Sequence, residues 1–157
     1  MINMNEKERI IKTIENIHHS VHNYPHKDKL IIDTMKYYRS LKDISNKYGQ
    51  MYFENLDDFF LEIVKFYKLG TKIMNPRTHF LEPHGHHKNG HTHQVDTGIY
   101  YLQIPKNSGN LFFHNLGITI EAQVDHFIVV PSNELHGVTM NKSNEIRIAL
   151  AFDIEQI

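Results

Sequence analysis

The chain has 157 residues and a formal net charge of −1, with 17 lysines and arginines against 18 aspartates and glutamates. A chain of this length is expected to form a single domain, residues 1–157, with a core that needs no crosslinks. The balanced charge argues against a global basic field for nucleic acid or anionic lipid. Because the chain has no cysteine, disulfides, thiolate metal sites and a cysteine nucleophile are excluded, and any metal must be held by His, Asp or Glu.

No apolar run approaches the roughly 20 residues of a membrane span, and the first residues lack the pattern of a signal peptide. We therefore expect a cytoplasmic protein with a small-molecule or protein side-chain substrate, and no nucleic-acid or membrane partner. A homodimer through sheet edges or the helical block is compatible with the fold expected below.

The first seventy residues are predicted to be mainly helical and to support the rest of the domain. Apolar residues recur at helical spacing from Asn5 to Pro25, from Leu30 to Tyr48 and from Asn55 to Gly70. All three segments are amphipathic, so each is expected to pack one face on a sheet.

Residues 71–157 change from helical spacing to short apolar runs separated by turn residues, which predicts a β-rich core. Many short strands at this spacing are typical of a sandwich or jelly roll, so the fold class is α+β, with N-terminal helices packed on the sheet. The predicted strands are Lys72–Met74, Thr97–Ile104, Leu111–His114, Ile118–Glu121, Phe127–Val130, Val138–Met140 and Ile146–Ile154.

Three histidines are the main metal-ligand candidates. His91 and His93 are two positions apart, so on an extended strand their side chains point to the same face. His136 follows a strand that ends at proline, and its imidazole would complete a triad with coordination positions left open for chemistry. Asp96 has the opposite strand parity to His91 and His93, so on an extended strand it points to the other face. A turn at Gln94 to Asp96 would make Asp96 the alternative to His93 as the second ligand.

An arginine on the last strand suggests a site for a carboxylate. Arg147 and Ala149 share one face of that strand, and a charged guanidinium pointing into a barrel is costly unless an anion meets it. The anion is either an internal Asp or Glu or the carboxylate of a cosubstrate. If the segment after His93 stays extended, Tyr101 and Thr97 share the inner face, and both are candidate cosubstrate-binding residues with Arg147. Tyr101 could donate a second hydrogen bond to the cosubstrate.

A local excess of histidine surrounds these candidates, since five of the 13 histidines fall between residues 84 and 93. Strand parity separates His91 and His93 from His84, His86 and His87. These other three either form a surface tract that collects metal without function or have a role that the sequence does not indicate.

From about Lys72 to Ile154 the chain resembles the small 2-oxoglutarate- and Fe(II)-dependent oxygenases of bacteria and phages. The resemblance lies in Ile99-Tyr-Tyr-Leu102 after a His-x-His, in Phe127-Ile-Val-Val-Pro131 leading to His136-Gly-Val138, and in Arg147-Ile-Ala-Leu-Ala-Phe152. It implies a double-stranded β-helix in which residues 71–157 form the core.

The resemblance also implies an activity and roles for individual residues. His91 and His136 would take two iron positions, Arg147 would pair with the distal carboxylate of 2-oxoglutarate, and Tyr101 would supply the adjacent hydroxyl. The implied cofactors are Fe(II) and 2-oxoglutarate, and the implied reaction is hydroxylation of a substrate C–H bond as the keto acid becomes succinate and CO₂. Most of the superfamily has Asp or Glu where this chain has His93.

Two other functions fit part of the pattern. A cupin-type metal protein without 2-oxoglutarate could be a dioxygenase, an isomerase or a small-molecule sensor, although the glutamate expected after the histidine pair is absent. A non-enzymatic β-sandwich module with a metal-collecting histidine loop is the other alternative, and in that protein Arg147 should pair with an internal acid.

Overall fold

The computed structural model describes residues 8, 19–20, 27–40, 50–51, 71–124 and 126–156. Its elements are β1 His19–Ser20, α2 Lys27–Ser40, β2 Gln50–Met51, β3 Thr71–Leu81, β4 His87–His91, β5 Asp96–Gln103, β6 Leu111–Phe113, β7 Ile118–Ile120, β8 His126–Val130, β9 His136–Val138 and β10 Arg147–Gln156. No helix among these residues is long and apolar enough to cross a membrane.

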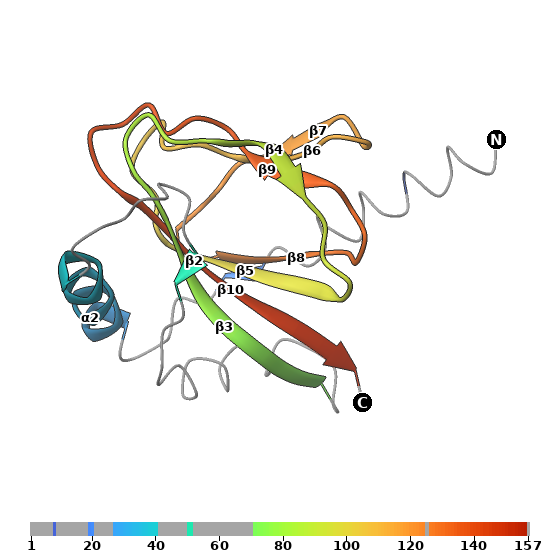
Figure 1. Cartoon of the computed structure of the whole chain (residues 1–157), viewed down its shortest axis with the longest axis horizontal. Coiled ribbons are helices and arrows are strands. Elements are labelled where there is room, and N and C mark those ends of the chain that lie inside the picture. Colours follow the sequence, from blue (N-terminus) through green and yellow to red (C-terminus); the bar gives the residue numbers. More distant parts are fainter. Residues whose placement is uncertain are drawn as a thin grey trace.

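Two antiparallel sheets face each other and make up most of the described structure (Figure 1). The larger sheet has the order β1-β8-β5-β10-β3-β2, and the smaller one has the order β4-β9-β6-β7. From β3 to β10 the chain alternates between the sheets in the way that defines a jelly roll: β3, β5, β8 and β10 lie in the larger sheet and β4, β6, β7 and β9 in the smaller. The predicted jelly roll is therefore confirmed.

Most predicted strands agree with the observed ones. The segments predicted at Thr97–Ile104, Leu111–His114, Ile118–Glu121, Phe127–Val130 and Ile146–Ile154 match β5, β6, β7, β8 and β10 to within two residues at each end. The last of these, β10, pairs with β3 on one side and β5 on the other, so β10 and β5 are the two middle strands of the larger sheet.

Other strand predictions were wrong in position or length. The strand predicted at Val138–Met140 begins two residues earlier, as β9, and the strand predicted at Lys72–Met74 continues to Leu81. The extension passes Asn75 and Pro76 through a register shift against β10, and Asn75 has a positive φ of 53°. A β-bulge at this point absorbs the proline, which has no N–H to donate to the ladder.

The helical predictions for the first seventy residues are only partly tested. Helix α2 overlaps the predicted Leu30–Tyr48 segment up to Ser40 and starts earlier, at Lys27. Residues 41–48 and the Asn55–Gly70 segment lie outside the described residues. The helix predicted from Asn5 to Pro25 was wrong at its end, where His19–Ser20 pairs with β8. The edge of a sheet offers unpaired backbone N–H and C=O groups, and pairing with them is a long-range contact that helical spacing in the sequence does not predict. Packing of α2 on the sheet stays a prediction.

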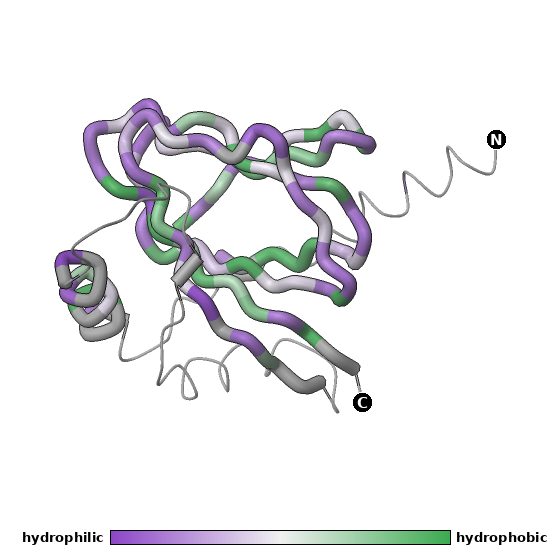
Figure 2. The backbone as a smooth tube through the Cα atoms, viewed as in Figure 1, coloured by the Kyte–Doolittle hydropathy of each residue, from purple (hydrophilic) through white to green (hydrophobic). Residues whose placement is uncertain are grey.

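One hydrophobic cluster lies between the sheets and takes apolar side chains from both layers. Figure 2 shows hydrophobic segments along the strands of both sheets. Alternation along β5 and β10 directs Tyr101 and Ala149 toward this cluster. Tyr100, Leu150 and Phe152 have the opposite parity and are buried as well, so buried side chains lie on both faces of the larger sheet. Gly98 on β5 faces the ring of Phe152 on β10 so closely that a Cβ atom there would lie 2.1 Å from the ring. The core cluster contains Tyr101, Leu111, Phe113, Leu116, Ala122, Ile128, Val130 and Ala149.

Candidate metal centre and cosubstrate pocket

Three histidine side chains converge between the two sheets. The potential ligand nitrogens of His91, His93 and His136 all lie within 4.8 Å of one another, and this is the only such group among the described residues. The ring centroids of His91 are 4.5 Å from those of both His93 and His136, and the latter two are 5.1 Å apart. Such spacing suits three imidazole nitrogens bound to one transition-metal ion.

The backbone around His91 is shaped to bring it against His136. The two residues are register partners in the β4–β9 pair, after a register shift that separates them from the His87 pairing. Gly90 has a φ of +72°, and a Cβ atom there would lie 2.6 Å from the carbonyl oxygen of His136. Only glycine tolerates both the left-handed backbone and this close approach, so Gly90 fixes where His91 points.

Hydrogen bonds hold the loop before His136 against the segment that carries His93. The amide of Asn133 donates to the carbonyl of His93 at 2.8 Å, and the amide of Ser132 donates to Oδ1 of Asp96 at 2.9 Å. Asp96 is thus committed to the loop through one carboxylate oxygen, and it is not part of the histidine group.

The tautomer of His136 follows from its hydrogen bond. Its Nδ1 lies 2.9 Å from the carbonyl oxygen of Glu134. A carbonyl only accepts, so Nδ1 carries the proton and Nε2 keeps its lone pair for a metal. A ring oriented by such a contact is the usual arrangement for a histidine ligand. The imidazole is also buried, which restricts its rotation further.

The strand-parity prediction reached the right face by a wrong route. It assumed one extended segment from His91 to Tyr101, but β4 ends at His91 and β5 begins at Asp96, so the chain crosses from one sheet to the other between them. Nevertheless His91, His93, Thr97 and Tyr101 all line the same cavity, because both sheets face it.

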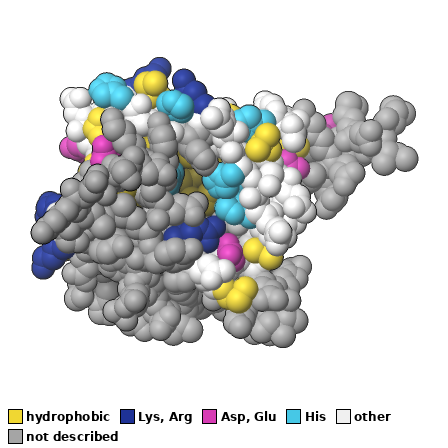
Figure 3. Space-filling model, in the orientation of Figure 1, with side chains coloured by type: hydrophobic (Ala, Val, Ile, Leu, Met, Phe, Trp, Pro, Cys, Tyr) yellow, Lys and Arg dark blue, Asp and Glu magenta, His cyan; other side chains and the backbone are white. Residues whose placement is uncertain are grey.

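That cavity has a volume of about 480 Å³ and lies between the sheets next to the histidines. Its floor is the centre of β10, where Ala149 and Ala151 face inward with little bulk. Across the sheet, Ala149 is flanked by His79 and Tyr101. Side chains larger than alanine at positions 149 and 151 would fill the cavity. On the face shown in Figure 3, histidine side chains gather beside lysine or arginine side chains near the middle of the molecule.

Arg147 is buried at one end of this floor. It is 1% exposed, and Tyr101 is equally buried beside it, with the guanidinium carbon 5.4 Å from the tyrosine ring centroid. Nε of Arg147 and the hydroxyl of Tyr101 have no hydrogen-bond partner of good geometry among the described residues. No acidic side chain in that part of the chain forms an ion pair with Arg147 either.

The two groups affect each other electrostatically. Burial raises the pKa of Tyr101, and the neighbouring Arg147 opposes that rise only in part. Burial also lowers the pKa of Arg147, and Tyr101 opposes that change. The phenol therefore stays protonated as a donor at neutral pH, and the guanidinium, which is a very weak acid, stays charged. A buried cation with unused hydrogen-bond donors is energetically costly unless an anion binds to it.

Thr97 lines the cavity at its other end. It is buried, and its hydroxyl donates weakly to the carbonyl of Val95 at 3.4 Å. Thr97 pairs with Asp153 on β10, six residues from Arg147. It therefore shares the cavity with Arg147 but lies far from it along the strand.

Two polar residues of the cavity were missed by the sequence analysis. Arg77 and His79 on β3 line the same space, facing Ala151 and Ala149 across the sheet. They alternate as expected for one face of a strand, and that signal was available once β3 was extended through Pro76. The strand was predicted to end at Met74, so the alternation beyond that residue went unused.

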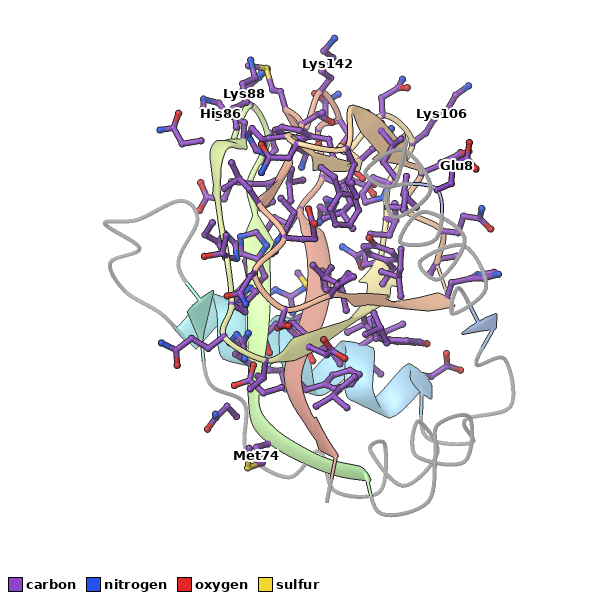
Figure 4. The ribbon with its side chains drawn as sticks, turned by 90° about the vertical axis from the view of Figure 1, so that its right-hand side faces the viewer. Glu8, Met74, His86, Lys88, Lys106 and Lys142 are labelled. Atoms are coloured by element: carbon purple, nitrogen blue, oxygen red, sulfur yellow. The ribbon has the colours of Figure 1, made fainter. Side chains whose placement is uncertain are left out.

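The remaining histidines of the local excess lie elsewhere. His84 is exposed at a turn with a φ of +69°, and Nδ1 of His86 accepts from the amide of Lys88 at 3.3 Å. Figure 4 shows His86 and Lys88 at the outer end of the molecule. Neither His84 nor His86 belongs to the metal-ligand group, and the side chain of His87 lies outside the described ones.

No family model and no curated protein sequence matches the chain, but solved structures do. The collagen prolyl hydroxylase of Paramecium Bursaria Chlorella virus-1, solved as a 2-oxoglutarate complex, is 15% identical with a TM-score of 0.61, over 89% of this chain and 95% of that one. HygX from Streptomyces hygroscopicus, with nickel and 2-oxoglutarate bound, is 6% identical with a TM-score of 0.66, over 96% and 86%.

A third similar structure is the prolyl hydroxylase of Trichoplax adhaerens in complex with a hypoxia inducible factor peptide fragment. It is 13% identical with a TM-score of 0.64, over 98% of this chain and 92% of that one. At such low identities the likeness shows that the chain shares the fold of these proteins. What the site does has to be inferred from its own residues.

Proposed function

We propose that the protein is an Fe(II)- and 2-oxoglutarate-dependent oxygenase that hydroxylates an organic substrate. The observation that carries the proposal is the combination of a three-histidine group with a buried, unneutralised Arg147 in one cavity. A metal-binding module needs only the histidines. Binding of a keto acid with two carboxylates needs the metal held by the histidines and also Arg147. Two of the three structures compared above contain 2-oxoglutarate in the same fold.

The residues present fit a divalent iron ion. We assign His91, His93 and His136 as its ligands, with imidazole nitrogens as donors of the kind that iron accepts. Because all three are neutral, the site would keep the full charge of the ion, where a carboxylate ligand would remove one unit. A more positive site binds an anionic cosubstrate more strongly. Asp96 is the weaker ligand candidate because its carboxylate anchors Ser132.

The keto acid fits the buried end of the cavity. Arg147 would bind its distal carboxylate through the planar guanidinium fork, and the Tyr101 hydroxyl would donate to the same group. Thr97, which shares the cavity but lies farther along it, is a less direct contact. Burial at 1% exposure excludes water from this salt bridge, which makes it stronger and more selective for a dicarboxylate.

When bound, Fe(II) and 2-oxoglutarate supply the oxidising chemistry that links decarboxylation to C–H hydroxylation. This chain's own residues orient the two groups. His136 is held in one tautomer by Glu134, Arg147 and Tyr101 fix the far end of the keto acid, and the Ala149 floor leaves room for the rest. A substrate is either a small molecule or a protein side chain, and the Trichoplax adhaerens structure has a peptide bound in this fold.

Anaerobic titration of 2-oxoglutarate into the iron-loaded protein tests the proposal. We expect a metal-to-ligand charge-transfer band that saturates at one equivalent and that is lost in Arg147→Met at the same keto-acid concentration. Iron binding without any such band would support a cupin-type metal protein, which the three-histidine set also fits. Absence of stoichiometric iron from the wild-type protein would support the non-enzymatic module.

The supporting features are proposed in the same way. We propose that the helices of the first seventy residues pack on the larger sheet of one domain, since Thr34 on α2 is fully buried while Ile32 is 54% exposed. Helix α2 lies on the β2 side of the larger sheet in Figure 1. A cytoplasmic location and a homodimer complete the proposal, and light scattering of the purified chain tests the second.

A further inference from the structure

We propose that Arg77 binds a carboxylate of the substrate at the end of the cavity away from Arg147. This inference rests on the proposed function, because it assigns to the substrate the part of the cavity that the keto acid leaves open. It also makes a specific statement about substrate class: an organic acid, or a chain bearing a carboxylate, and not an amine or a neutral compound.

Position along the sheet separates the two arginines. Arg77 pairs across the sheet with Ala151, four residues from Arg147 on β10. At about 3.3 Å per residue the two positions are about 13 Å apart along the strand. Both side chains line the same cavity, and the small side chain of Ala149 lies between their two positions along β10. A single keto acid on Arg147 does not need a second cation at that distance.

Arg77 is held in place by its neighbours. Its Nη1 donates to the carbonyl of Asn75 at 2.9 Å and to Oδ1 of Asp153 at 3.1 Å. The other carboxylate oxygen of Asp153 accepts from Nδ2 of Asn75 at 2.8 Å. The bulge at Asn75 therefore does more than absorb Pro76, because it places a carbonyl and an amide around the ion pair.

The guanidinium keeps an unused edge. Both of its hydrogen bonds use Nη1, so Nε and Nη2 have no partner among the described residues. Those two N–H groups form the side-on fork that matches a carboxylate in a bidentate contact. The side chain is 7% exposed and already fixed, so little conformational entropy remains to be lost when an anion binds.

The competing explanation is that Arg77 only anchors Asp153. That ion pair joins β3 to β10, and Asp153 is 17% exposed on its side chain, so a structural role needs no ligand. A purely structural pair, however, gives the same result when either partner is changed. Arg77→Gln and Asp153→Asn are therefore a matched pair of variants, since only the first removes the proposed anion contact.

The test uses the full chain loaded with Zn²⁺ and saturated with 2-oxoglutarate, with benzoate as the probe and benzamide as its uncharged match. Binding is followed by the Nε–H signals of the arginines in a ¹H–¹⁵N spectrum, and the Arg77 signal is identified by its loss in Arg77→Gln. The chain contains only four arginines, which keeps the spectrum simple. The same titration is repeated without 2-oxoglutarate.

We expect benzoate, but not benzamide, to shift the Arg77 signal, and we expect its affinity to fall about tenfold or more in Arg77→Gln. Asp153→Asn should keep the affinity, because the amide oxygen of asparagine can still accept from Nη1 and hold Arg77 in place. Arg77→Lys, which retains the charge for Asp153, should fold normally and bind benzoate more weakly than wild type. The 2-oxoglutarate affinity of Arg77→Gln should equal that of wild type.

Three results would overturn the inference: equal binding of benzoate and benzamide, equal losses in Arg77→Gln and Asp153→Asn, or weaker 2-oxoglutarate binding as the main effect of Arg77→Gln. Failure of the proposed function has a different signature. In that case 2-oxoglutarate does not bind the wild-type protein, while the titration without 2-oxoglutarate still reports whether Arg77 takes a carboxylate.

Discussion

The two sheets supply different halves of the candidate site. The smaller sheet contributes His91 and His136 from short strands, and the loop that follows β4 contributes His93. The larger sheet contributes Arg147 and Tyr101 from its long central strands, where both are 1% exposed. His91 and His93, by contrast, are only half-buried.

This difference follows from the charge of the groups. Neutral imidazoles can be partly exposed without loss, and short strands suffice when hydrogen bonds such as that of His136 to Glu134 orient them. A guanidinium that must select a dicarboxylate works best when water is excluded, which requires the middle of a sheet. Metal binding and keto-acid binding should therefore be separable by mutation.

The largest expected effect is loss of the metal in His136→Ala. Removing one of three neutral ligands should abolish one-to-one iron binding, as should His91→Ala, while far-ultraviolet circular dichroism stays unchanged. Iron stoichiometry after desalting is the measurement. His84→Ala, at an exposed turn outside the group, is the control, and one-to-one iron in His136→Ala would remove that residue from the site.

The next effect separates the larger sheet from the smaller. Arg147→Met should weaken 2-oxoglutarate binding by about 2 to 5 kcal/mol, as expected for a buried charge pair, and leave iron affinity unchanged. Without keto acid its melting temperature should be no lower than that of wild type, because a buried cation without an acidic partner among the described residues has been removed. A large fall in iron affinity would contradict the separation.

A smaller contrast tests the second ligand position. His93→Ala should reduce iron affinity more than Asp96→Asn, because the asparagine oxygen can still accept from the amide of Ser132. Competition with a metal-sensitive dye gives both affinities. The opposite ranking would mean that Asp96, and not His93, is the metal ligand, and that its hydrogen bond with Ser132 is its secondary role.

Tyr101→Phe sharpens the description of the larger sheet. Loss of one hydroxyl donor should weaken 2-oxoglutarate by about 0.5 to 1.5 kcal/mol, well below the effect of Arg147→Met. Isothermal titration calorimetry on the zinc-loaded protein measures the difference. An effect as large as that of Arg147→Met would mean that the tyrosine, and not the arginine, is the main anchor.

The smallest effect is a loss of stability at high pH. Burial raises the pKa of Tyr100 from 10.0 to about 12, and it raises that of Tyr101 as well. The folded chain keeps protons that the unfolded chain releases above pH 10, so this stability is present below pH 10 and lost as the pH rises through the folded pKa values. Denaturant unfolding from pH 9 to 11 should show a shallower fall in Tyr100→Phe than in wild type.

Parts of this fold and site could be read from local sequence because they depend on alternation. Tyr101 and Ala149 reached the correct face from parity alone, and β5, β6, β7, β8 and β10 were found within two residues. Arg77 was missed because the strand was predicted to end at Met74, whereas a bulge carries β3 on to Leu81. The pairing of His19–Ser20 with β8 was missed because an edge partner is a long-range contact.

The sequence by itself determined which groups could do chemistry here. It excluded thiolate ligands, identified the three histidines and Arg147, and favoured a jelly roll, because residue type and period-two alternation are local properties. Only the tertiary structure decided that His91 and His136 are register partners, that Asp96 is committed to Ser132, and that Arg77 shares the cavity. Those relations join segments far apart in the chain, and sheet pairing, bulges and backbone hydrogen bonds set them.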